Sequence, residues 1–383
     1  MRSSAAIAVG ILVPALACER SADRASTWSD WRSRTDTALW HFVTEDGTTC
    51  RDCISLEEVL IIGDPEGPGY HEESQWVTRD SIGRYWVGGV GRQKVYGPEG
   101  DFLRQVGRTG AGPLEFRGVG PTFTDAMGQV HVFDQRNRRE TVIGPQFDLI
   151  SEHSLPWGPI YHAAPLPDAE HIIVNGVFRE PSRIGLPLHM IRGPDIVASF
   201  GMIERGSYSL GTMHMLRRVT IDRDGTIFSG NYFDYSVEAW SPSGQRLLGF
   251  KRDGLWQPPP DGQPQPLSRE TNLWGLLLAM NVDENDRLWV ITWAPREDWL
   301  SNVSEGVGPD GQTHLRPRDS DASIRRTAID VIDLGSGRLV AHRQYDELLY
   351  GFLGNRSVFG NRFTSAGEPR LVIWKVDLKE REQ

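Results

Sequence analysis

Side chains able to bind or transform a ligand are sparse in this chain of 383 residues. Two imidazoles, two guanidinium groups and two amides, with two aromatic neighbours, would make a polar pocket if they converged on one axis. These residues are Tyr161, His162, His214, Arg217, Asn272, Trp274, Asn361 and Arg362. Imidazole titrates near neutral pH and guanidinium keeps its charge, so we predict His214 as a base and Arg217 as an anion clamp. The alternative is that all eight are ordinary strand-end residues that satisfy backbone groups.

A repeated turn-and-strand unit supplies the elements that would bring these residues together. In the best copies Asp opens a turn, Gly supplies the positive φ that the turn needs, and an aromatic and β-branched run follows as a strand. Asp286 stands where Gly would be in the copy at 283–290. The copies span residues 80–87, 125–132, 222–228 and 283–290, with a shorter one at 168–174 and a looser sixth at 365–374. A second strand–turn–strand element follows the better copies, at 95–103, 237–248 and 331–340. Two hairpin turns in each repeat imply about four strands per unit.

The spacing of the copies predicts the fold. Gly83 and Gly128 are 45 residues apart, and four-stranded propeller blades have periods of roughly 40–50 residues. We therefore predict an all-β, six-bladed β-propeller whose innermost strands precede the turns and carry the eight candidate residues. The alternative is a β-sandwich of unrelated hairpins, which needs no fixed period.

A propeller must join its two ends. Residues 54–62 are predicted to form the outer strand of the last blade, which is otherwise built from residues 356–378. A free helix would suit Glu57 and Glu58 but not the β-branched residues after them.

The N-terminus is predicted to direct the protein out of the cytoplasm. A short apolar run ends in Ala17-Cys18, which resembles the bacterial lipoprotein signal with Cys18 as the lipidated residue. An ordinary secretory signal is the alternative. We divide the chain into a signal peptide (1–17), a flexible tether (18–37) and a propeller domain (38–383), anchored by lipid in the periplasm or at the outer membrane. Trp28 and Trp31 are unusual in a tether and suggest docking on the domain or the membrane.

The cysteine count bears on the compartment. Lipidation of Cys18 leaves Cys50 and Cys53, which we predict to form a disulfide in an oxidising compartment. A redox site or half of a zinc site are the alternatives, but no second Cys or His pair has zinc spacing.

The Gly-rich segment 107–116 lacks the Lys and the following helix of a phosphate-binding loop, so we interpret it as a loop into the next blade. With residues 134–142 it resembles NHL-type six-bladed propellers, in which a Gly-Pro-x-Glu-Phe loop joins blades and an Asp-x-x-Asn-x-Arg turn follows the second strand. The match covers residues 76–150 and fades beyond. NHL-type propellers include binding scaffolds, lyases and lactonases. Gluconolactonase-like propellers also bind calcium, for which Asn281 and Asn361 match, but no Glu falls at the matching first-blade position.

The formal net charge of −10 argues against nucleic acid as a partner. We interpret Arg136, Arg138 and Arg139 as pairing with carboxylates between blades or as solvated. Residues 296–322 are interpreted as an insertion over one face of the fifth blade that could close a site or bind a partner. No metal-ligand set or cofactor motif is visible, and we expect a monomer. The function predicted first is a membrane-anchored scaffold that binds a protein, peptide or glycan at the channel mouth. The second is an extracytoplasmic, metal-dependent lyase or lactonase with its site in the channel.

Overall fold

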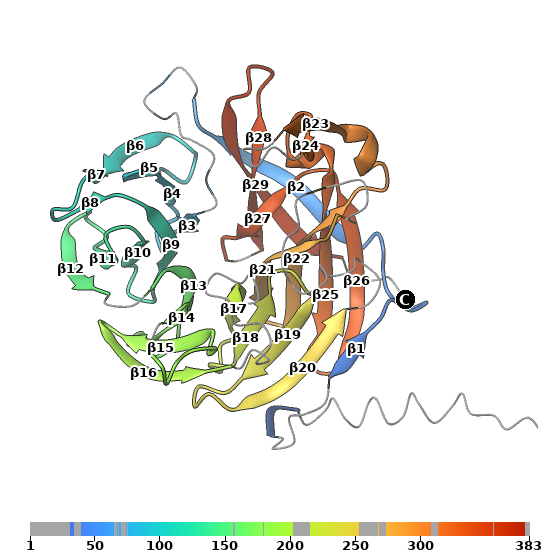
Figure 1. Cartoon of the computed structure of the whole chain (residues 1–383), viewed down its shortest axis with the longest axis horizontal. Helices are drawn as coiled ribbons and strands as arrows, with labels where there is room; N and C mark the ends of the chain where they lie inside the picture. Colours follow the sequence, from blue (N-terminus) through green and yellow to red (C-terminus); the bar gives the residue numbers. More distant parts are fainter. Residues whose placement is uncertain are drawn as a thin grey trace, which may run out of the picture.

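The protein is a six-bladed β-propeller with almost no helix, as the turn repeat predicted (Figure 1). The computed structural model describes residues 31–33, 40–64, 67, 69, 74, 76–155, 158–178, 180–201, 215–252, 267, 273–307, 313–354 and 356–379. Each blade is a sheet whose four main strands are antiparallel, and the innermost strands surround the axis of the ring.

The strands fall into four positions within the blades. The innermost strands are β3 (Val77–Arg79), β9 (Val119–Thr124), β13 (Ile160–Pro165), β17 (Arg217–Ile221), β21 (Leu276–Val282) and β27 (Leu349–Phe352). The second strands are β4 (Tyr85–Gly89), β10 (Val130–Asp134), β14 (Ile172–Gly176), β18 (Ile227–Asn231), β22 (Arg287–Pro295) and β28 (Ser357–Phe363). The third strands are β5 (Arg92–Tyr96), β11 (Arg139–Ile143), β15 (Leu188–Arg192), β19 (Ser236–Trp240), β25 (Arg325–Asp333) and β29 (Pro369–Leu378). The outer strands are β6 (Phe102–Val106), β12 (Leu149–Ser154), β16 (Asp195–Phe200), β20 (Arg246–Arg252), β26 (Arg338–Tyr345) and β2 (Ile54–Ile62).

Shorter elements decorate the ring. They are η1 (Trp31–Ser33), β1 (His41–Val43), β7 (Arg108–Thr109), β8 (Glu115–Phe116), η4 (Trp299–Asn302), β23 (Val303–Val307), β24 (Thr313–Pro317) and η5 (Asp321–Ser323). Because neighbouring strands in a blade are antiparallel, the turn after the innermost strand and the turn before the outer strand share one face. The loop between the second and third strands and the connection to the next blade share the opposite face, called here the loop face.

The hydrophobic core is divided among the junctions between blades. One buried cluster joins the first and second blades through Trp86, Phe116 and Val130, and another joins the sixth and first through Phe359 and Tyr85. The remaining four junctions each have a cluster of the same kind. The core therefore forms a ring around the axis, and the centre is left for polar groups and a cavity.

The ring closes as predicted from the N-terminal strand. Strand β2 pairs antiparallel with β29, with Glu58 opposite Trp374 and Ile62 opposite Leu371. Ile54 and Ile62 are fully buried. The alternative of a free helix over these residues is wrong, since the cross-strand pairs give the β-branched residues a face to pack on.

The repeated Asp is a turn residue, as predicted. Asp80 Oδ1 accepts hydrogen bonds from the backbone N–H groups of Ile82 and Arg84. Asp283 does the same for Asn285 and Arg287, so its turn follows turn chemistry rather than the pattern of a calcium loop.

A second carboxylate oxygen of this Asp ties the turn to the strand behind it. Asp80 Oδ2 accepts the indole N–H of Trp86, and Asp283 Oδ2 accepts that of Trp289, each six residues later. The aromatic residue of the repeat therefore has a polar role in addition to packing.

The sixth copy of the repeat was placed at the wrong turn. The turn at 364–367 joins β28 to β29, whereas the turn after the innermost strand β27 contains Gly354 and Arg356, both with positive φ. No Asp precedes Gly354, so the sequence pattern passed over this turn. Asn361 and Arg362 consequently lie on the second strand of the last blade rather than on its innermost strand.

Two residues of the predicted tether dock on the fourth and fifth blades. The Trp31 indole is buried against Phe228, and its N–H donates to the carbonyl oxygen of Leu334 at 2.9 Å. Arg32 pairs with Asp222 at 3.2 Å between Nη2 and Oδ2. Phe228 stands where the first and fifth blades have Trp and the second has His131, so Arg32 supplies the donor that this Asp lacks from its own strand. The signal peptide, Cys18 and the rest of the tether lie outside the described residues.

The chain then runs along the outer edges of the last three blades. Strand β1 pairs parallel with β20, Cys50 bridges to Ala341, and β2 completes the sixth blade. The sulfur atoms of Cys50 and Cys53 are bonded at the step between the fifth and sixth blades. Among the described residues, no helix has the length and apolar character needed to cross a bilayer.

Candidate functional site

A cavity of about 230 Å³ occupies the centre of the ring. All six innermost strands contribute to its wall, among them Thr78, Thr122, His162, Arg218 and Thr220. Of the described residues, those in the wall therefore supply one imidazole, one guanidinium and several hydroxyl groups. This central cavity is the channel that the propeller prediction required.

His162 is the predicted residue that the structure places in the cavity wall. The backbone N–H of Val219 donates to its Nδ1 at 3.3 Å, so the ring proton of the neutral imidazole is on Nε2. Burial, with a further contribution from the charge of Arg218, lowers the pKa of His162 to about 3. The ring is uncharged at neutral pH and acts as a hydrogen-bond donor rather than as a cation. Tyr161 precedes it on β13, and burial raises the pKa of its hydroxyl.

Arg217, the predicted anion clamp, is buried in the blade instead of lining the cavity. Its backbone N–H donates to Asn175 Oδ1, and its Nη1 donates to the carbonyl oxygen of Leu216. Burial lowers the pKa of Arg217, against the opposing effect of Glu238 and Asp234.

The next residue, Arg218, is the guanidinium that lines the cavity. Neighbouring residues on a strand point to opposite sides, so the pair Arg217-Arg218 places one cation on each side of β17. That alternation was the sequence signal for Arg218, but no sequence feature showed which of the two faced the axis.

The other candidates that the structure describes do not line this cavity. Trp274 is buried before β21, and its carbonyl oxygen accepts a hydrogen bond from Arg325 Nη1 at 2.6 Å. Asn361 Nδ2 donates to the carbonyl oxygen of Ser74, and Arg362 pairs with Glu58 at 2.7 Å. His214 and Asn272 lie outside the described residues.

A larger groove of about 1050 Å³ lies on the loop face beside the cavity. One wall is the chain from Arg318 to Ala322, at the end of the predicted insertion, which leaves the fifth blade between β22 and β25 as the hairpin β23–β24. The facing wall belongs to the sixth blade and includes Asn361, Arg362, Phe363 and Trp374. Tyr350 contributes to both the groove and the central cavity.

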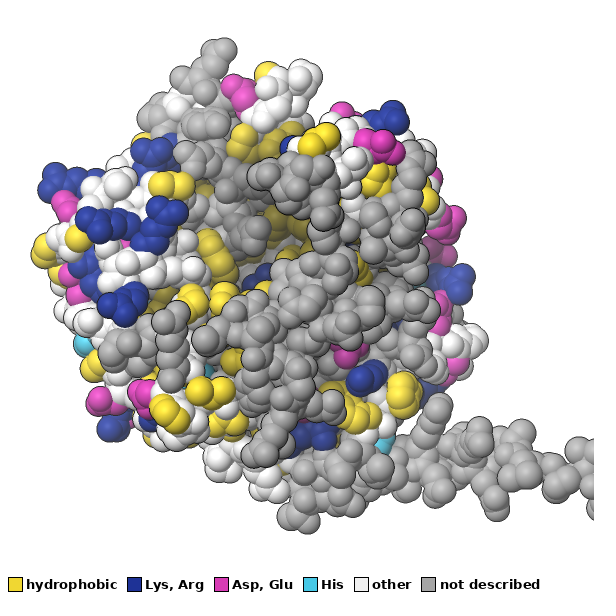
Figure 2. All heavy atoms as spheres, viewed as in Figure 1, with side chains coloured by type: hydrophobic (Ala, Val, Ile, Leu, Met, Phe, Trp, Pro, Cys, Tyr) yellow, Lys and Arg dark blue, Asp and Glu magenta, His cyan; other side chains and the backbone are white. Residues whose placement is uncertain are grey.

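Basic side chains gather over the first two blades, to the left in Figure 2. Arg92, Arg117, Arg136 and Arg138 are exposed, and by topology they lie on the loop face. This local charge contrasts with the formal net charge of −10 for the chain. The predicted role of Arg136 and Arg138 as solvated residues agrees with their exposure.

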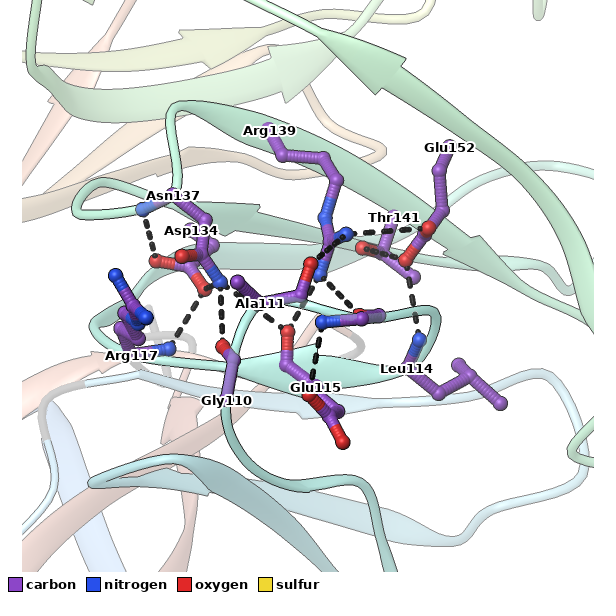
Figure 3. Close-up of polar contacts among 11 residues, drawn as sticks. Gly110, Ala111, Leu114, Glu115, Arg117, Asp134, Asn137, Arg139, Thr141 and Glu152 are labelled. Carbon is purple, nitrogen blue, oxygen red and sulfur yellow. Dashed lines mark hydrogen bonds and ion pairs between the residues drawn. The ribbon is translucent and has the colours of Figure 1, made fainter.

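The Gly-rich loop from β6 to β9 is held by an internal polar network (Figure 3). Asp134 is buried and accepts backbone N–H groups of Arg117, Gly118, Arg136 and Asn137. The Asn137 amide also donates to Asp134 Oδ2, at 2.8 Å.

Arg139 completes this network. Its Nη1 donates to Glu152 Oε2 and to the carbonyl oxygen of Ala111, both at 3.2 Å, and its Nη2 donates to the carbonyl oxygen of Gly112 at 3.0 Å. Arg139 does pair with a carboxylate, but Glu152 lies on the neighbouring strand of the same blade, so the predicted pairing between blades is wrong. The loop is a structural joint rather than a phosphate cradle.

The described part of the chain contains no group of three or more His, Cys, Asp or Glu side chains that could hold a metal ion.

Comparisons with known proteins identify the fold of the chain but not its family or activity. No family model matches the chain, so the NHL assignment stays a prediction, and no curated protein matches it. A "Putative exported protein" from Bacteroides fragilis aligns with a TM-score of 0.59 at 10% identity, over 89% of this chain and 100% of that chain. A member of the DUF4221 family from Bacteroides vulgatus aligns with a TM-score of 0.54 at 9% identity, over 86% of this chain and 99% of that one.

Virginiamycin B lyase from Staphylococcus aureus aligns with a TM-score of only 0.45 at 12% identity, over 84% of this chain and 99% of that one. This likeness is too weak for the chemistry of the lyase to be carried over. The two Bacteroides structures show that the chain shares their propeller fold.

Proposed function

We propose that this protein is an extracytoplasmic, lipid-anchored propeller that binds a protein, peptide or glycan on its loop face. The observation that carries the proposal is the groove between the insertion and the sixth blade, which opens beside the central cavity. Tyr350, Phe363 and Trp374 line it together with charged residues of both signs. Aromatic surfaces flanked by a few charges suit peptide and sugar ligands, because they combine apolar contact with hydrogen bonds that fix orientation.

A binding role is favoured over the metal-dependent lyase or lactonase. The central cavity presents the cation Arg218 and the neutral donor His162. Such groups attract an anion and repel a metal ion, whose ligands are carboxylates, carbonyls or free imidazole nitrogens.

The location rests on the sequence signal at Cys18 and agrees with the name of the B. fragilis neighbour. We expect Cys18→Ala to move the protein from the membrane fraction to the soluble fraction without changing its circular dichroism spectrum. Retention of C18A in membranes at the wild-type level would argue against the lipid anchor.

Site-specific photocrosslinking in the cell envelope tests the binding role. A photoreactive phenylalanine analogue replaces Phe363 in the groove, and the matched control carries it at Leu103 on the outer strand β6, which is similarly exposed. We expect a discrete crosslinked product from position 363 and none from position 103. The proposal fails if neither position gives a product, or if both give the same products.

A further inference from the structure

The central cavity contains a cation that has no carboxylate partner among the described residues. Arg218 Nε is buried without a hydrogen-bond acceptor. The guanidinium carbon lies 4.9 Å from the centroid of the Tyr232 ring, and the Tyr232 side chain also shares a hydrogen bond with Arg218. Removing a charge from water without a partner is unfavourable, so a guanidinium in this position favours an anion beside it.

Two other arginines with buried side chains bring their own carboxylates. Arg84 Nε lies 2.6 Å from Asp80 Oδ2, and Arg252 Nε lies 3.2 Å from Asp330 Oδ2. Arg218 forms no such pair with a described residue. Its surroundings differ from those of arginines whose role is to join strands and blades.

His162 adds a neutral donor to the same cavity. Val219 N–H occupies its Nδ1, so Nε2 carries the hydrogen. The imidazole and the guanidinium come from neighbouring strands, β13 and β17, of adjacent blades. One anion between them would receive a charge-assisted bond from Arg218 and a second bond from His162.

We propose that the central cavity binds a carboxylate group of the ligand, with Arg218 as its cation and His162 as a neutral hydrogen-bond donor. The proposal deepens the binding function proposed above and rests on it. The planar fork of a guanidinium matches the two oxygens of a carboxylate. Whole ligands occupy pockets of roughly 300–1,000 Å³, whereas this cavity measures about 230 Å³, so it accepts one acidic end of a ligand.

Two sources of carboxylate fit this chemistry: the C-terminus of a peptide and the acid group of a uronic acid sugar. The exposed arginines of the first two blades lie on the loop face and would raise the local concentration of either. The experiment therefore uses one probe for each source.

Titration calorimetry on the full chain in detergent tests the proposal with N-acetylalanine and glucuronate as probes. N-acetylalanine amide and glucose are the uncharged counterparts, and inorganic phosphate is the competing anion. We expect one of the two acids to bind, its uncharged counterpart not to bind, and phosphate to bind at least tenfold more weakly. Arg218→Met should weaken the acid at least tenfold and His162→Phe by severalfold, while Arg223→Met, at an exposed turn, should have no effect.

The proposal is overturned if neither acid binds, if phosphate binds as tightly, or if binding survives Arg218→Met. Circular dichroism reports whether R218M folds, and H162F provides a second reading if it does not. A groove crosslink at position 363 without binding of either acid would refute the carboxylate site and leave the broader function standing. Binding of an acid without that crosslink would support the carboxylate site and refute binding in the groove.

Discussion

Arg139 and Arg218 both lie at partly buried polar centres of this propeller, and their surroundings differ. The two Nη atoms of Arg139 donate to loop carbonyl oxygens and to the carboxylate of Glu152. Among the described residues, Arg218 has only the Tyr232 side chain as a partner, although both arginines have an Nε without an acceptor. The difference teaches that a guanidinium surrounded by its own acceptors holds the fold together, whereas one that lacks them is available to a ligand.

The largest effect is expected from breaking the satisfied centre at Asp134. Asp134→Ala leaves four backbone N–H groups and the Asn137 amide without their acceptor, and should lower the free energy of unfolding by about 3–5 kcal/mol. Urea denaturation measures the loss. Asp148→Ala, at an exposed turn of the same blade, is the control and should change stability little. Equal stability of D134A and wild type would show that the network is dispensable.

A smaller loss is expected at Arg139 itself. Arg139→Met removes donors to three carbonyl oxygens and leaves Glu152 without its cation, so stability should fall by about 2–3 kcal/mol. Arg136→Met changes an exposed arginine in the same turn and should be neutral. The interpretation of Arg139 as structural is wrong if the two variants are equally stable.

Burial of His162 in the wall of the central cavity should make the stability of the protein depend on pH. The pKa of His162 is about 3 in the folded protein against 6.5 for a free imidazole, mainly because of burial. Between those values the unfolded chain binds a proton that the folded chain does not, so stability falls with decreasing pH by up to about 1.4 kcal/mol per unit for this group.

His162→Gln should therefore reduce the loss of stability between pH 6.5 and pH 4.5, as measured by urea denaturation at several pH values. Above pH 6.5 the substitution has no effect of this kind. His189, whose pKa burial also lowers to about 3, gives an independent comparison in an outer part of a blade. If neither His162→Gln nor His189→Gln changes the dependence of stability on pH, then neither imidazole stays neutral in the folded protein.

The smallest effect is expected for a hydroxyl in the cavity wall. Thr122 Oγ1 donates to the carbonyl oxygen of Gly120 and accepts from Gln93 Nε2 at 3.3 Å. Thr122→Val should lower stability by about 1 kcal/mol or less. A loss as large as that of D134A would mean that the cavity wall holds the ring together as firmly as the loop network does.

The fold could be predicted from the sequence because its repeated turns depend on interactions between residues close together in the chain. An Asp that caps its own turn and a Gly with positive φ act within a few residues, so the turns at Asp80, Asp125 and Asp222 could be recognised directly. Closure by residues 54–62 followed from counting strands, because an unpaired edge in a ring needs a partner.

The candidate site was harder to predict because it depends on register and on distant parts of the chain. A shift of one residue exchanges the two sides of a strand, and this exchange separates Arg217 from Arg218. The turn at Gly354 lacks the repeat Asp, so the innermost strand of the sixth blade was assigned about ten residues too late. Tyr350, which contributes to both the cavity and the groove, was missed for the same reason.

The free energy of unfolding of Arg218→Met, without added ligand, tests most directly whether this arginine serves a ligand or the fold. Removing a half-buried cation that has no carboxylate partner in the described part of the chain should leave stability unchanged or raise it by about 1 kcal/mol. A decrease as large as that of Arg139→Met would contradict this, since Arg218 would then be holding the propeller together.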